Sequence, residues 1–156
     1  MLDFSDKPYE FIPPRLSPLV LWLSRQLGRF IVLRGSGHRV VSLSVDNLDV
    51  VHECEALAGN RLLFLPNHST HSDPEIMTEV LRQADIVSLF MAAYEVFLRG
   101  RFRSWVIQRT GAFSVDRDGN DKQSLKTAVE TLTAGHQALT IFPEGNVHLL
   151  NDRVMP

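Results

Sequence analysis

The sequence predicts a single α/β domain in which a largely parallel sheet is flanked by helices. The first observation is that short apolar runs alternate with segments whose apolar residues recur at helical spacing. The second is that these runs end in Pro, Gly, Asn or Asp, which are typical of turns. The third is composition, since 156 residues with 44% hydrophobic and 22% charged side chains suffice for one domain with a core.

The N-terminal region, residues 1–37, is expected to stand apart from a domain over residues 38–156. Residues 1–18 are rich in proline and aromatic side chains and predict an irregular arm. Residues 19–33 predict an amphipathic helix that is too short and too charged to span a bilayer. Its apolar side carries Leu19, Leu23, Leu27, Phe30 and Ile31, with Trp22 near the edge. Such a helix can lie in a membrane interface or pack on the domain's own core, and the residues alone leave both open.

The elements beyond this region follow in order. After a break at Gly35-Ser36-Gly37, apolar runs predict strands over residues 40–45, 62–65, 85–92, 112–115 and 138–142. Helical spacing predicts helices over residues 48–57, 74–83, 95–108 and 121–134. Gly59 and Gly135 are expected to end the first and last helices, and Gly100 to break the third. Asp73 stands before Pro74, where it can cap the free N–H groups of the second helix.

Charge and cysteine content narrow the classes of function. A net charge of −2 does not favour binding to nucleic acid. Arginine and aromatic residues mix between residues 97 and 109, which is typical of a solvated basic face or of a surface that meets anionic lipid. An aromatic platform for single-stranded nucleic acid would need a more basic domain. The lone Cys54 excludes an internal disulfide, and the acidic, polar start of the chain does not resemble a secretory signal.

Polar residues follow three of the predicted strands. The first strand end carries Asn67, His68 and Asp73, the second Asp116 and Arg117, and the third Glu144, Gly145 and Asn146. Open parallel sheets bind ligands at the carboxyl ends of their strands. If these strands are parallel neighbours, a base, a cation and a carboxylate converge at one edge. Histidine held by a carboxylate is a common general base near neutral pH.

The same residues carry a resemblance to a known family. Asn67, His68 and Asp73 match the pattern N-H-x-x-x-x-D, residues 111–117 resemble a second motif that ends in Arg, and residues 142–145 read F-P-E-G. In order and spacing the three motifs, within residues 38–146, resemble those of the glycerolipid acyltransferases. This is the lysophosphatidic acid acyltransferase-like, or 1-acylglycerol-3-phosphate acyltransferase, family.

The resemblance implies an O-acyltransferase of phospholipid biosynthesis. A fatty acyl group would pass from acyl-CoA or acyl carrier protein to a hydroxyl of a glycerol phosphate or lysophosphatidic acid, at the cytoplasmic face of a membrane. His68 would be the general base and Asp73 would orient it, with no covalent enzyme intermediate. Arg117 would hold the acceptor phosphate. The other expected substrate contacts are Glu144, Gly145, Asn67 and Phe113. Neither a metal nor a cofactor beyond the acyl donor is expected.

The sequence departs from this family in three places. Asn146 stands where Thr or Ser usually follows the third motif. Tyr94 precedes Glu95 where the family commonly has a basic residue, so a contact with phosphate or acyl donor is expected to be missing. The family's domain continues to a fourth motif, so the chain is expected to lack a C-terminal part.

Other functions compete with this interpretation. A thioester hydrolase would use the same His68 and Asp73 with water as acceptor, and a noncatalytic lipid- or membrane-binding module would use only the Arg and aromatic surfaces. Ser69 and Ser72 are poor candidates for a nucleophile because neither lies in a G-x-S-x-G elbow. A metal held by His68 and His71 is disfavoured because their spacing in a loop is not that of a zincin helix.

Overall fold

The computed structural model describes residues 8–28, 40–117 and 119–145. The helices are α1 (Pro18–Leu27), α2 (Leu48–Ala58), α3 (Asp73–Gln83), α4 (Tyr94–Leu98), α5 (Arg101–Arg109) and α6 (Lys122–Ala134). The strands are β1 (Leu63–Phe64), β2 (Ser88–Ala93), β3 (Ala112–Val115) and β4 (Ala138–Thr140). All strand pairs are parallel and their order is β1-β4-β2-β3, which confirms the predicted α/β class.

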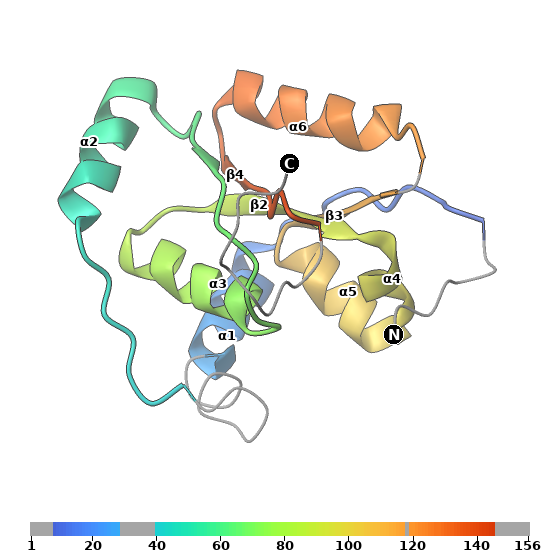
Figure 1. Cartoon of the computed structure of the whole chain (residues 1–156), viewed down its shortest axis with the longest axis horizontal. Helices are drawn as coiled ribbons and strands as arrows, with labels where there is room; N and C mark the ends of the chain where they lie inside the picture. The colour runs from blue at the N-terminus through green and yellow to red at the C-terminus, as the bar shows by residue number, and fades with distance from the viewer. Residues whose placement is uncertain (1–7, 29–39, 118, 146–156) are drawn as a thin grey trace.

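Helices cover both faces of the sheet. Figure 1 shows α6 on one side and α1, α3 and α5 on the other. The core on the α3 side consists of Leu81, Ala84, Ile86 and Ala138, and the core on the α6 side consists of Leu89, Phe113, Ala128 and Leu139. Neighbours along β4 therefore face opposite cores, as the pleat of a strand requires. Burying one such leucine stabilises the fold by about 2 kcal/mol.

The N-terminal arm lies along the outer edge of β3. Ser114 N donates a hydrogen bond to Ile12 O at 3.0 Å, and Ile12 N donates to Ser114 Oγ at 2.8 Å. The hydroxyl of Tyr9 is hydrogen-bonded to the carboxylate of Asp121, just before α6. The described part of the predicted arm is irregular, and it covers an edge that β3 would otherwise expose.

The apolar side of α1 points away from the domain. Leu19, Trp22, Leu23 and Leu27 are 66%, 58%, 42% and 54% exposed. α1 packs against α3 and α5, and Arg25 Nη2 donates a hydrogen bond to Ile86 O at 2.7 Å. Arg25 and the partly buried Val20 and Leu21 thus face the fold, while the other apolar residues of the helix face outward. The sequence left open whether the apolar side of this helix lies in a membrane interface or packs on the domain's own core. In the described part of the helix, this apolar side does not pack on the core.

One predicted strand is wrong. Residues 40–45 form no strand and Val41 is 91% exposed. A strand needs a hydrogen-bonded neighbour, and this segment pairs with neither β1 nor β3, the two edges of the described sheet. The prediction was wrong because alternating apolar residues indicate which side chains can be buried. They do not indicate whether the segment has a neighbouring strand to pair with.

The remaining predicted elements are confirmed to within three residues at each end, except that the end of the helix predicted over residues 19–33, with Phe30 and Ile31, lies outside the described residues. Gly100 separates α4 from α5, and Gly59 and Gly135 end α2 and α6 with φ of +61° and +68°. The predicted break at residues 35–37, the domain boundary beside it, Asn146 and the end of the chain lie outside the described residues. Within the ranges that are described, no helix is long and apolar enough to cross a bilayer.

Candidate active site

The topology gathers the segments that follow the four strands at one edge of the sheet. Because every strand pair is parallel, the residues that follow β1, β2, β3 and β4 lie at the same end. β1 and β4 are neighbours, as the predicted convergence required. β3, however, is separated from β4 by β2, so the start of α4, which follows β2 directly, lies between them.

His68 and Asp73 form a polar pair in the loop between β1 and α3. Nδ1 of His68 lies 3.1 Å from Oδ2 of Asp73, and the two side chains are 16% and 18% exposed. A carboxylate only accepts hydrogen bonds, so Nδ1 carries the proton and Nε2 keeps its lone pair. The imidazole lies against Phe142, with ring centroids 4.6 Å apart. This arrangement leaves Nε2 as the basic atom.

Asp73 is held by its own loop. Its Oδ2 accepts a hydrogen bond from Thr70 N at 2.8 Å, and its Oδ1 accepts one from Thr70 Oγ1 at 2.7 Å. Burial raises the pKa of Asp73, but hydrogen bonds from Thr70, His68 and the backbone of Ser69 outweigh burial and lower this pKa below its ordinary value. Ser72 is the N-cap residue of α3, so the prediction that Asp73 caps the helix is wrong.

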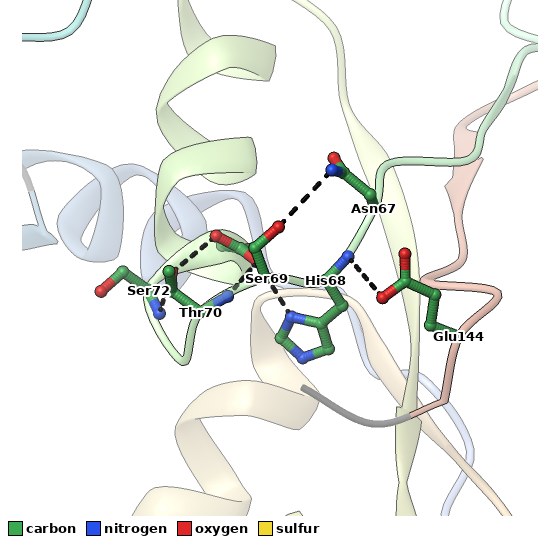
Figure 2. A network of polar contacts seen from close by, with 7 residues as sticks. Asn67, His68, Ser69, Thr70, Ser72 and Glu144 are labelled. Atoms are coloured by element: carbon green, nitrogen blue, oxygen red, sulfur yellow. Dashed lines mark hydrogen bonds and ion pairs between the residues drawn. The ribbon is translucent and has the colours of Figure 1, made fainter. Parts of the chain in front are cut away.

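Glu144 connects the loop after β4 to the loop after β1. The backbone N of His68 donates a hydrogen bond to Glu144 Oε2 at 3.3 Å. Figure 2 shows the Glu144 carboxylate beside this backbone nitrogen. Glu144 therefore fixes the backbone of His68 without occupying the ring nitrogens.

Arg117 follows β3 and is held from two sides. Its Nη1 donates a hydrogen bond to Gly145 O at 2.8 Å, and its Nη2 lies 3.3 Å from Glu95 Oε2. Gly145 has φ of +67°, a conformation that favours glycine. Glu95 is in the first turn of α4, which begins directly after β2, so Arg117 reaches across the end of that strand. Polar contacts thereby link the His68 end of the site to the Arg117 end through Glu144 and Gly145.

The other predicted residues lie less centrally. Asn67 is exposed, and its Nδ2 is 3.5 Å from Ser69 Oγ, at the limit of a hydrogen bond. Figure 2 shows Asn67 pointing away from the His68 ring. Phe113 is 0% exposed and packs near Phe11 in the core on the α6 side. It is a core residue in this structure and is not presented to a ligand at the sheet edge.

Sequence reasoning missed three contributors. Thr70 binds Asp73, Phe142 packs on His68, and Glu95 pairs with Arg117. A Thr three residues before Asp is a common local hydrogen-bonding pattern, so Thr70 could have been found. Over the described ranges there is no set of three His, Cys, Asp or Glu residues placed to hold a metal ion.

This edge of the sheet holds a base, His68, and a cation, Arg117, in fixed positions. The lone pair of His68 Nε2 can take a proton from a hydroxyl, and the ionised Asp73 stabilises the imidazolium that forms. The guanidinium of Arg117 can bind an anion such as phosphate.

Comparison with known proteins gives one family and one curated relative. The family model described as "Acyltransferase" matches residues 42–155. A curated protein named 1-acyl-sn-glycerol-3-phosphate acyltransferase, from Streptococcus pneumoniae (strain ATCC BAA-255 / R6), is 32% identical over 89 residues. The match covers 57% of this chain and 32% of that protein, so the chain spans about a third of that relative's length. No solved structure matches the chain.

Proposed function

Because the chain belongs to the acyltransferase family, we propose that it moves a fatty acyl group from a thioester to a hydroxyl of a glycerol phosphate or its monoacyl form. The observation that carries the proposal is the His68–Asp73 pair, with Nδ1 and Oδ2 3.1 Å apart. The name of the relative from Streptococcus pneumoniae supports a 1-acylglycerol 3-phosphate acceptor. The donor is acyl-CoA or an acyl carrier protein.

In the proposed reaction, the acceptor hydroxyl attacks the thioester carbonyl while Nε2 of His68 removes its proton. A carbon–oxygen bond forms and the carbon–sulfur bond breaks, and the proton passes from His68 to the departing thiolate. Asp73 stays ionised and stabilises the imidazolium in between, while Thr70 holds this carboxylate in place. No bond to an enzyme nucleophile is needed.

Arg117 supplies the proposed contact with the acceptor phosphate. A guanidinium binds phosphate through charge-assisted hydrogen bonds. Gly145 and Glu144 shape this side of the site, because Gly145 O accepts a hydrogen bond from Arg117 and Glu144 accepts one from the His68 backbone. Asn67 lies at the exposed rim. In this scheme the phosphate fixes the acceptor while His68 acts on its hydroxyl.

We also infer that the protein meets a membrane surface, at its cytoplasmic face, through α1 and α5. The outward apolar side of α1 supports this inference. On α5, Phe102 and Trp105 are 78% and 46% exposed and their rings stack at 6.1 Å. The guanidinium of Arg109 lies 5.7 Å from the Trp105 ring centre. Both helices lie on the same side of the sheet (Figure 1), and such mixtures of Trp, Leu and Arg suit the interface of a bilayer.

The proposed activity is tested by thiol release from a long-chain acyl-CoA, with and without 1-acylglycerol 3-phosphate. We expect release that depends on the acceptor, and a fall of at least about 10²-fold in His68→Ala, the usual share of a general base. His71→Ala is the matched control, since His71 is an exposed histidine of the same loop, and it should retain activity. Thiol release that does not depend on the acceptor but is lost in His68→Ala would identify a hydrolase. A His68→Ala variant as active as wild type would refute the mechanism.

A further inference from the structure

Glu95 lies between two parts of the site, Arg117 and Gly145, because of the order of the strands in the sheet. β2 separates β3 from β4 in the sheet. Arg117 follows β3 and Gly145 follows β4, so a side chain just beyond β2 lies between them. Glu95 is the second residue of α4, which begins directly after β2. Its position is therefore a consequence of strand order and not of sequence proximity to either partner.

Helix α4 and the loop after β4 hold the guanidinium of Arg117 at two different nitrogens. Nη2 lies 3.3 Å from Glu95 Oε2, while Nη1 donates to Gly145 O at 2.8 Å. Two contacts at separate nitrogens fix both the position and the plane of a rigid, planar group. The side chains of Arg117 and Glu95 are 22% and 32% exposed, so water screens this pair less than a fully exposed ion pair.

The proposed function gives this fixed plane a use. Phosphate binds best when a guanidinium presents parallel N–H groups to its oxygens, which makes orientation part of the affinity. A mobile arginine would have to be ordered at each binding event, at a cost in conformational entropy. Glu95 removes that cost before the acceptor arrives.

We propose that Glu95 is a positioning residue for the anion-binding site of Arg117. It touches neither the thioester nor the reacting hydroxyl, and it acts through the guanidinium that it orients. The inference rests on the proposed role of Arg117 in binding the acceptor. It predicts a selective effect on acceptor affinity, since among the described residues Glu95 makes no hydrogen bond or ion pair with His68 or Asp73.

Steady-state kinetics with varied 1-acylglycerol 3-phosphate test the proposal. In Glu95→Ala we expect KM for this acceptor to rise about tenfold while kcat changes less than about twofold. Glu95→Gln keeps an oxygen within reach of Nη2 and should restore most of the affinity. Glu130→Ala, which removes an exposed carboxylate paired with Lys126 on α6, is the control for lost charge and should behave as wild type. An unchanged or lower KM in Glu95→Ala would overturn the proposal, the latter by showing that Glu95 competes with the acceptor.

A double-variant comparison separates positioning from a structural role. If Glu95 acts through Arg117, then Glu95→Ala adds no further rise in KM once Arg117→Ala is present. If Glu95 only stabilises α4, the two effects on KM multiply and the proposal fails.

A binding measurement makes the test independent of turnover. The side-chain Nε–H signal of Arg117 can be identified in an NMR spectrum by its loss in Arg117→Lys, and followed during titration with glycerol 3-phosphate. We expect the wild-type signal to shift on titration, and Glu95→Ala to need about tenfold more ligand for the same shift. Equal midpoints, or no shift in wild type, would contradict the positioning role. If the signal behaves as expected but no acyl transfer occurs, the proposed reaction fails while the anion site stands.

Discussion

The charge of Asp73 makes the stability of the fold depend on pH. Hydrogen bonds from Thr70, His68 and the Ser69 backbone lower the pKa of Asp73 in the folded protein. Folding therefore favours the charged form, and its contribution to the free energy of unfolding is present above about pH 4. That contribution is lost as pH falls through the lowered pKa. Urea unfolding from pH 6 to pH 3 should show wild type losing more stability on acidification than Asp73→Asn, which does not titrate.

Thr70→Ala is the matched control for this prediction. It keeps the carboxylate but removes one of the hydrogen bonds that lower its pKa, so the loss of stability on acidification should fall between those of wild type and Asp73→Asn. Parallel stability curves for all three proteins across this pH range would show that Asp73 is not stabilised as its contacts indicate.

Single residues of the site were predictable to different degrees. His68 and Asp73 could be identified because their partnership is local and their spacing is part of a pattern. The capping role expected of Asp73 was wrong, because its oxygens accept hydrogen bonds from the preceding loop. Glu95 could not be paired with Arg117, since their contact depends on the order of strands in the sheet. Burial of Phe113 likewise depends on tertiary packing.

Among the elements, α6 depends most visibly on its N-cap residue, Asp121. Asp121 accepts hydrogen bonds from Gln123 N and Ser124 N at 3.0 Å, from Asp116 N at 3.1 Å, and from the hydroxyl of Tyr9. We expect Asp121→Ala to lower the free energy of unfolding by about 2 kcal/mol, as loss of an N-cap and of several partly buried hydrogen bonds does. Urea unfolding at pH 7 measures the change.

Asp121→Asn separates the cap from the charge. Asparagine caps helices as well as aspartate, so this variant should retain more than half of the stability that the alanine variant loses. If Asp121→Ala is as stable as wild type, α6 does not rely on this cap.

Elements were more predictable than their pairing. Helices α2, α3 and α6 follow from periodicity and from glycines or proline at their ends, because these signals are local. Strands β2, β3 and β4 follow from short apolar runs between turns. Residues 40–45 carry a similar apolar signal without forming a strand, since they pair with neither edge strand of the described sheet. Strand order is decided by packing of the whole chain and has no local signal.

At the scale of the whole molecule, the outward apolar side of α1 predicts binding to vesicles. The protein should sediment with vesicles that contain an anionic lipid such as phosphatidylglycerol. Leu23→Ser should weaken the partition coefficient about tenfold, because it removes an apolar side chain that the bilayer would bury. Trp22→Ser should weaken it at least as much.

Leu57→Ser provides the control for this prediction. Leu57 is 90% exposed but lies on α2, outside the proposed interface of α1 and α5, so its replacement should leave vesicle binding unchanged. Equal losses in the α1 and α2 variants would indicate nonspecific adhesion, and wild-type protein that stays in solution would refute the membrane surface.

The position of the N-terminal arm along β3 also constrains the order in which parts of the chain can fold. Tyr9 is hydrogen-bonded to Asp121, 112 positions later in the chain, and Ile12 is hydrogen-bonded to Ser114, 102 positions later. On a ribosome that delivers the chain from its N-terminus, the arm is made first yet cannot settle until α6 has begun to emerge. β3 is made long after the arm and shortly before α6, so the arm is already present when this strand emerges. Its edge can be covered almost as soon as it is made, which shortens the time in which a nascent chain could pair there with a neighbour.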